Sequence, residues 1–232
     1  MPKVGLSPIA GWYPKDINRF ITSLIPSGKV VWQDDMEGTT LLWASVVGTL
    51  AFNTGGSNPL RGDSCASLTT AAGAGSESDM LKRFGWLRNM VIGLEGWIRL
   101  PDISDLSYVY WTLEGFSGSQ AIEFAIRYDV VNALLQYHTT GNVYRNIPGG
   151  AFPNWSDLIQ MHSKLVVDFT NQLYMYFQIG SLHLDMRTLI PDVNPNVINQ
   201  RWWPSYLIVT ADGAAVMYVD DVIVTNEEVY SQ

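Results

Sequence analysis

The sequence contains little sulfur and little positive charge. Cys65 is the single cysteine among 232 residues, so no intrachain disulfide can form. It lies in the alternating apolar run 64–68, which predicts a small buried side chain rather than a reactive thiol. Fourteen Lys and Arg stand against 22 Asp and Glu, a net charge of −8. Because phosphate binding depends on cationic side chains, we expect no nucleic acid partner and no membrane surface as a partner.

Long hydrophobic runs are also missing. No stretch of about 18 apolar residues occurs, so no membrane-spanning helix is predicted. Met1 is followed by Pro2 and Lys3 without an apolar segment of the kind that secretory signals contain. We therefore expect no signal peptide and no transmembrane segment in this chain.

Apolar and aromatic residues, in contrast, are abundant. Hydrophobic residues make up 47% of the chain, with 9 Trp, 11 Tyr and 8 Phe, which is enough to build a large core. From residue 29 onward the hydrophobic pattern has a period of two, with tight turns at 117–119, 171–172 and 180–181. These features predict an all-β domain over residues 29–232, folded as a two-sheet antiparallel jelly-roll sandwich.

The segment 1–28 differs in pattern. Ile17, Phe20, Ile21 and Leu24 follow helical spacing between Pro14 and Pro26. We expect an N-terminal arm with one short amphipathic helix, which packs on its own sandwich or docks on a neighbouring subunit. Two further segments are expected to be loops: the small-residue stretch 71–78 and the long stretch 141–163, where function often lies.

Three stretches in order resemble the concanavalin A-like lectin/glucanase superfamily. They are WQDDMEG at 32–38 followed by Trp43, the segment His162–Met186, and the segment Met217–Thr225. The resemblance implies two curved sheets, one of them concave, with the first and last strands side by side. Several members of the superfamily join these strands with one structural Ca²⁺, and the matching ligands here are Asp35, Glu37 and Asp220. The alternative is a solvated acidic cluster at a sheet edge.

The catalytic motif of the superfamily's glucanases, E-x-D-x-(x)-E on one strand, is not found. The nearest match, Glu77-Ser78-Asp79, has no third acid. Glu114 and Glu123 lie on neighbouring expected strands and can face each other, although a structural role is favoured for them. The sequence therefore predicts no catalytic residue and favours a non-enzymatic protein.

Aromatic side chains on a sheet face could stack on sugar rings, and half of the candidates must belong to the core. The candidate carbohydrate-binding residues are Trp97, Tyr110, Trp155, Trp202 and Trp203, from a wider set that adds Tyr108, Trp111, Tyr137 and Tyr144. Trp202 and Trp203 are adjacent, so they must point to opposite faces of a strand.

Three functions remain open. The favoured one is a non-catalytic structural or adhesive subunit of a phage or virus particle, located in the virion. It would assemble through residues 1–28 as a homo-oligomer or with other particle subunits. The second is a carbohydrate-binding module with a glycan partner, and the third is a divergent glycoside hydrolase or polysaccharide lyase. Fold resemblance alone does not decide among them.

Overall fold

A computed structural model describes residues 28–38, 40–54, 62–85, 90–117, 120–152, 155, 160–195 and 201–227. Over these residues the chain forms sixteen strands and no helix, arranged as two antiparallel eight-stranded sheets. The predicted all-β sandwich is thus confirmed. The predicted arm and its helix lie outside the described residues. Within those residues, no helix has the length and apolar character needed to cross a membrane.

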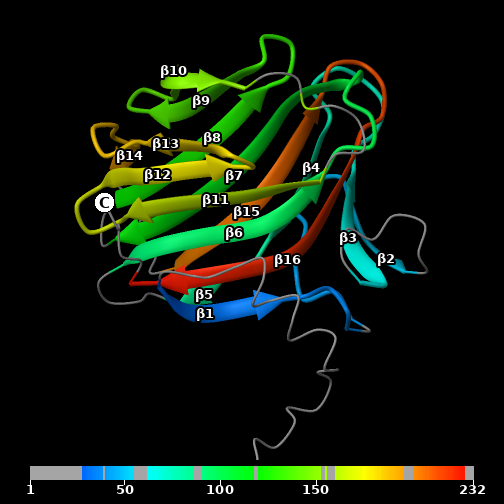
Figure 1. Cartoon of the computed structure of the whole chain (residues 1–232), viewed down its shortest axis with the longest axis horizontal. Coiled ribbons are helices and arrows are strands. Elements are labelled where there is room, and N and C mark those ends of the chain that lie inside the picture. Colours follow the sequence, from blue (N-terminus) through cyan, green and yellow to red (C-terminus); the bar gives the residue numbers. More distant parts are fainter. Residues whose placement is uncertain are drawn as a thin grey trace, which may run out of the picture.

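Sheet A is the front layer in Figure 1. Its strands in spatial order are β13 (Leu182–Asp185), β12 (Leu173–Ile179), β11 (Gln160–Asp168), β6 (Val91–Arg99), β16 (Val216–Asn226), β3 (Ser64–Thr69) and β2 (Thr49–Thr54), with β1 (Lys29–Asp34) also paired to β16. Residues 164–186 contain the tight meander that the sequence predicts, with turns at 169–172 and 180–181.

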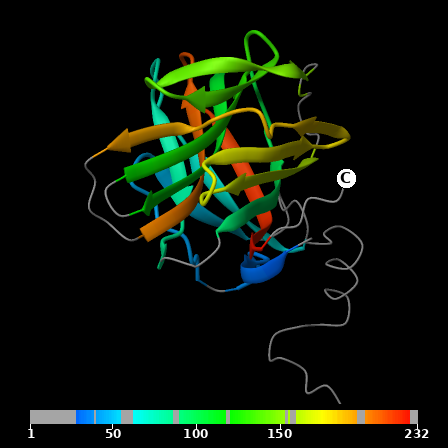
Figure 2. The ribbon, with the colours of Figure 1, turned by 90° about the vertical axis from the view of Figure 1, so that its left-hand side faces the viewer.

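Sheet B lies behind sheet A, and the turned view in Figure 2 separates β7 and β8 from β11 and β12. Its strands in spatial order are β10 (Val143–Ala151), β9 (Leu134–Thr139), β8 (Gln120–Asp129), β7 (Leu106–Ser117), β15 (Arg201–Thr210) and β4 (Glu77–Leu81), with β14 (Asp192–Pro195) beside β8 and β5 (Phe84–Gly85) beside β15.

The first and last strands pair, as the sequence predicts. β1 runs antiparallel to β16, with Lys29 opposite Asn226 and Asp34 opposite Val222. On its other edge β16 pairs with β6, and a bulge interrupts that ladder after Asp220, where Asp221 adopts a φ of 47°. The two ends of the sandwich domain are therefore joined at one place in sheet A.

Large aromatic side chains fill the space between the sheets. Trp111 stacks on Trp155 with ring centroids 6.4 Å apart and meets Phe177 of sheet A edge-on at 5.1 Å. Its Nε1–H donates to Ser163 Oγ at 2.9 Å, so the one polar atom of the ring is satisfied. Cys65 is fully buried, as expected.

Both segments that the sequence suggested to be loops contain strands. β4 begins at Glu77, where the polar residues Glu77-Ser78-Asp79 pair with β15. Within 141–163, β10 spans Val143–Ala151 and β11 starts at Gln160. The Pro and Gly residues at 148–150 suggested a loop, yet here they lie inside an irregular edge strand whose register shifts between Asn146 and Ala151.

Candidate functional site

The outer face of sheet B gathers acids and tyrosines from several strands. Along β7, Val109, Trp111 and Leu113 are fully buried toward sheet A. The alternating residues therefore point outward, and they are half-buried by their neighbours on the same face. We call this surface the carboxylate–tyrosine face; it consists of Tyr108, Tyr110, Glu114, Glu123, Arg127, His138, Tyr144 and Trp203.

Glu114 and Glu123 are direct partners across the β7–β8 hairpin. Residues in that position have Cβ atoms about 4.5–5.5 Å apart, so the two glutamate side chains are neighbours on one face of the sheet. Burial, and then the charge of Glu123, raise the pKa of Glu114 to about 7, while a hydrogen bond from Trp203 opposes the rise. Burial also raises the pKa of Glu123, with the His138 ring opposing and Asp192 adding to the shift. At neutral pH the pair therefore holds a proton part of the time.

His138 of β9 approaches this pair from the side. Its Nδ1 lies 3.5 Å from Glu123 Oε1, and its Nε2 is 2.9 Å from Asn142 Oδ1. The ring stacks on Tyr144, with centroids 4.7 Å apart, and only 2% of the residue is exposed. His138 is thus fixed in orientation by Asn142 and Tyr144, with one nitrogen directed at Glu123.

Tyr174 of sheet A supports the backbone below the site. The β8–β9 ladder ends at Ile126 opposite Tyr137. Beyond that point the Tyr174 hydroxyl lies between the strands: it accepts a hydrogen bond from Ala125 N–H at 3.0 Å, and its oxygen is 2.9 Å from the His138 carbonyl oxygen. Burial raises the pKa of Tyr174, which keeps the hydroxyl protonated as a donor. The position of His138 therefore depends on a side chain from the opposite sheet.

Arg127 of β8 lies among the tyrosine rings of the carboxylate–tyrosine face. Its guanidinium lies 4.3 Å from the Tyr108 ring centroid and 3.9 Å from that of Tyr144. Its Nε–H donates to Gln136 Oε1 at 2.6 Å. Cation–π contact on both sides and a hydrogen bond in the plane fix the guanidinium among the rings. Arg127 therefore holds Tyr108 and Tyr144 in place. Burial, and then repulsion from Glu123, raise the pKa of the Tyr144 hydroxyl.

Asp192 closes the face beside Glu123, its partner on β14. One carboxylate oxygen accepts a hydrogen bond from Gly141 N–H at 3.0 Å, and the other from Asn194 Nδ2 at 2.8 Å. Glu123 on β8 therefore lies between two further acids, Glu114 on β7 and Asp192 on β14. Burial and neighbouring charges raise the pKa values of Glu114 and Glu123, and adjacent groups with such displaced pKa values are typical of functional sites.

The predicted carbohydrate-binding residues separate into three groups. Tyr110 and Trp203 lie on the carboxylate–tyrosine face. Trp97 lies on the outer face of sheet A, with its ring 5.3 Å from that of His162. Trp155 and Trp202 are fully buried, so their assignment is corrected: both are core residues and cannot stack on a sugar. The adjacent Trp202 and Trp203 do point to opposite faces, as the strand geometry requires.

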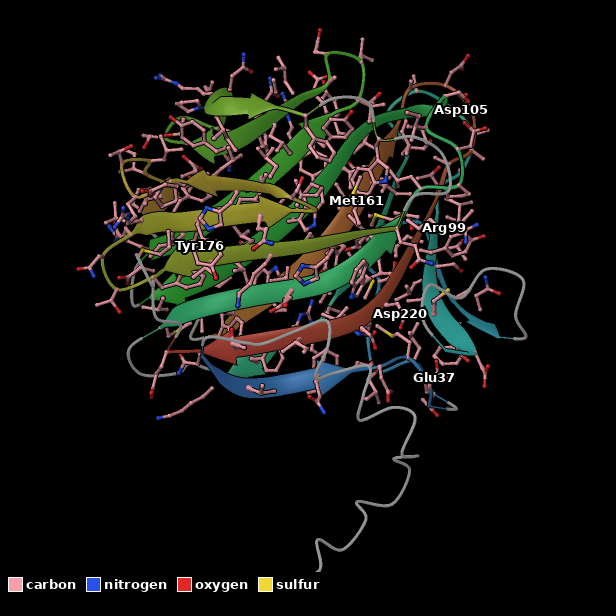
Figure 3. The ribbon with its side chains drawn as sticks, in the orientation of Figure 1. Glu37, Arg99, Asp105, Met161, Tyr176 and Asp220 are labelled. Atoms are coloured by element: carbon pink, nitrogen blue, oxygen red, sulfur yellow. The ribbon has the colours of Figure 1, made fainter. Side chains whose placement is uncertain are left out.

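The acids predicted to bind calcium have partners within the protein. Asp35 Oδ1 accepts a hydrogen bond from Glu37 N–H at 3.2 Å. Glu37 Oε1 accepts one from Asp63 N–H at 2.8 Å. Asp220 lies on β16, while Glu37 lies beyond the end of β1 (Figure 3). In the part of the chain covered by the structure, no group of three or more His, Cys, Asp or Glu is placed to hold a metal ion. Calcium binding stays a prediction.

Neither the protein-family models nor the curated proteins give a match. A carbohydrate esterase from the Shiga toxin-encoding bacteriophage phi24B superposes with a TM-score of 0.54 at 12% identity, covering 84% of this chain and 100% of that one. An endo-β-1,4-glucuronan lyase from the fungus Trichoderma reesei gives 0.53 at 10% identity, covering 88% and 95%.

A third structure comes from endo-acting O-glycanases of the human gut microbiota, with a TM-score of 0.52 at 10% identity, covering 85% of this chain and 99% of that one. The comparisons show the fold of this chain. At such low identity they do not transfer an activity, so function rests on the residues of the face itself.

Sequence patterns did not predict that Arg127 and Asp192 belong to the site. They also did not predict the contact of His138 with Glu123. Alternation along 121–127 is enough to place Glu123 and Arg127 on one side of a strand. No local signal, however, shows that β9 and β14 approach that side.

Proposed function

We propose that the chain binds a glycan on the carboxylate–tyrosine face. The observation that carries this proposal is the convergence of tyrosine rings, Trp203 and the Glu114–Glu123 pair on one side of sheet B. Sugars are bound by aromatic surfaces that cover their apolar faces and by a few polar groups that pair with their hydroxyls. The three fold neighbours, a carbohydrate esterase, a glucuronan lyase and an O-glycanase, agree with a glycan ligand.

Replacing Trp203 by alanine is expected to weaken glycan binding about tenfold or more, equivalent to about 1.4 kcal/mol. Trp203 packs on Phe116 at 5.0 Å from the outward side of β15, so its loss removes an aromatic surface without opening the core. Binding would be measured by isothermal titration with a glycan chosen from an array screened with the wild-type chain.

The matched control is Trp97→Ala, which removes an aromatic ring from the outer face of sheet A. We expect it to leave affinity within about threefold, less than 1 kcal/mol. A loss of affinity in Trp97→Ala but not in Trp203→Ala would move the glycan site to sheet A. An array without any bound glycan would contradict glycan binding altogether.

A second candidate is the particle subunit expected from the sequence, with residues 1–28 joining copies or other subunits in a virion. The fold likeness to a bacteriophage protein favours it. The full chain is then expected to form a defined oligomer in light scattering coupled to size-exclusion chromatography. A chain that stays monomeric at high concentration would argue against assembly, whereas glycan binding would be unaffected.

A further inference from the structure

We infer that the carboxylate–tyrosine face selects an amino sugar, whose ammonium group binds at Glu123 beside His138 Nδ1. This inference rests on the proposed glycan site and names the class of its ligand. Two observations carry it. One is the order of side chains across sheet B, and the other is a buried nitrogen of His138 that faces Glu123 without forming a hydrogen bond.

One row of paired residues crosses four strands of sheet B. Trp203 on β15 is opposite Glu114 on β7. Glu114 is opposite Glu123 on β8, and Glu123 is opposite Asp192 on β14. Since neighbouring strands lie about 4.8 Å apart, the row extends over roughly 14 Å. An aromatic ring that can pack on a sugar therefore stands at one end of the row, and three acids follow it.

The Nδ1 atom of His138 lacks a donor on the side of Glu123. Its Nε2 atom lies 2.9 Å from Asn142 Oδ1, and Nε2 carries the hydrogen there because the amide oxygen accepts. In the neutral ring Nδ1 is then an acceptor, 3.5 Å from Glu123 Oε1, which is an acceptor too. The His138 side chain is 3% exposed, and Nδ1 has no hydrogen-bond partner among the described residues. A ligand donor that binds here satisfies both acceptors, and an ammonium group carries three donors.

Glu123 is accessible to a ligand and lies apart from the arginine of the same face. Its side chain is 31% exposed. Among the described residues, no Lys or Arg forms an ion pair with an acid of the row. Arg127 lies four residues from Glu123, about 14 Å along β8, and its guanidinium is held by two tyrosine rings and Gln136. An amino sugar therefore supplies the positive charge that these side chains do not bring to Glu123.

The protonation of the two glutamates agrees with a cationic ligand. Burial is the largest cause that raises the pKa values of Glu114 and Glu123. An adjacent ammonium group favours the ionised carboxylates and opposes both shifts, so the ligand is expected to displace protons as it binds. A uronate would bring another negative charge beside these acids, which is unfavourable. An N-acetylated sugar brings no charge, so it gains nothing from them.

The experiment compares two ligands with the same rings and linkages, a chitosan tetramer made of glucosamine and a chitin tetramer in which every amine is acetylated. Isothermal titration of the full chain at pH 6.5 measures both affinities. We expect the chitosan tetramer to bind at least tenfold more tightly, as one charge-assisted hydrogen bond accounts for. Glu123→Gln is expected to abolish this preference and to change affinity for the chitin tetramer less than threefold. The control is Asp185→Asn, which removes an exposed negative charge from sheet A and should keep the wild-type preference.

Repeating the titration in two buffers of different ionisation enthalpy measures the protons exchanged on binding. We expect proton release with the chitosan tetramer in the wild type, less release in Glu114→Gln, and none with the chitin tetramer. Circular dichroism checks the fold of each variant, and the comparison of the two tetramers in the wild type stands without any variant.

The outcomes separate this inference from the glycan-binding proposal. Equal affinity for the two tetramers, or an unchanged preference in a folded Glu123→Gln, would overturn the amino-sugar inference alone. Binding of neither tetramer by a chain that binds another glycan on the array would do the same. Tighter binding of tetralysine than of the chitosan tetramer would assign the acids to a basic peptide and also overturn the inference. Absence of binding to both tetramers and to every glycan of the array would overturn both.

Discussion

Replacing Trp111 by alanine is expected to lower the free energy of unfolding by about 3–5 kcal/mol, the range for large aromatic residues removed from a core. Trp111 is fully buried, stacks on Trp155, contacts Phe177 of sheet A and donates to Ser163 Oγ. Its removal leaves a cavity between the sheets and a buried hydroxyl without its donor. Urea unfolding followed by fluorescence or circular dichroism would measure the loss.

Trp203→Ala is the control for this prediction, because its ring lies on the outer face of the same sheet. We expect the control to lose less than half as much stability as Trp111→Ala. A loss below about 1 kcal/mol in Trp111→Ala, typical of a surface change, would contradict the packing described between the sheets. Trp111 also lies between Tyr110 and Thr112 on β7, so its packing fixes the strand that carries Glu114.

Glu114→Gln is expected to stabilise the protein at pH 8 by about 2–3 kcal/mol and to have little effect near pH 4. The folded protein holds the Glu114 proton with a pKa of about 7, against an ordinary value of 4.5. Because the folded state binds this proton more tightly than the unfolded state, stability falls as pH rises from 4.5 to 7 and the full loss persists above 7. Glutamine resembles the protonated carboxyl and avoids this loss.

The groups that face this carboxyl are Glu123 on β8, Trp203 on β15 and, beyond Glu123, His138 and Asp192. Calorimetric melting at pH 4 and pH 8 would compare wild type, Glu114→Gln and the exposed control Glu77→Gln. Equal stabilisation at both pH values would show that burial of the charge is not the cause. A substitution that weakens glycan binding and raises stability at pH 8 would show that the acid is kept for binding rather than for folding.

Local sequence patterns were sufficient for much of the sandwich. Period-two alternation gave the strands from 91 to 128 and from 165 to 185, and the short turn at 117–119 gave the hairpin in which Glu114 and Glu123 face each other. The pairing of the first and last strands followed from a resemblance spread over three motifs. Strand β4 was not predicted because its first residues, Glu77-Ser78-Asp79, are polar. Asp79 Oδ1 accepts hydrogen bonds from Val46 N–H at 2.8 Å and from Val47 N–H at 3.1 Å, and no pattern within the strand encodes these contacts.

The sequence by itself determined which side chains alternate along each strand, because that depends on the chain's own period and its nearest turns. It could not determine which alternating set faces the core, so Trp202 and Trp203 could not be told apart. Only the tertiary structure decided that Trp203, His138 and Asp192 surround the Glu114–Glu123 pair, since they come from strands that meet through long-range packing. Tyr174 shows the reason most directly: a side chain of sheet A fixes the backbone that presents His138 on sheet B.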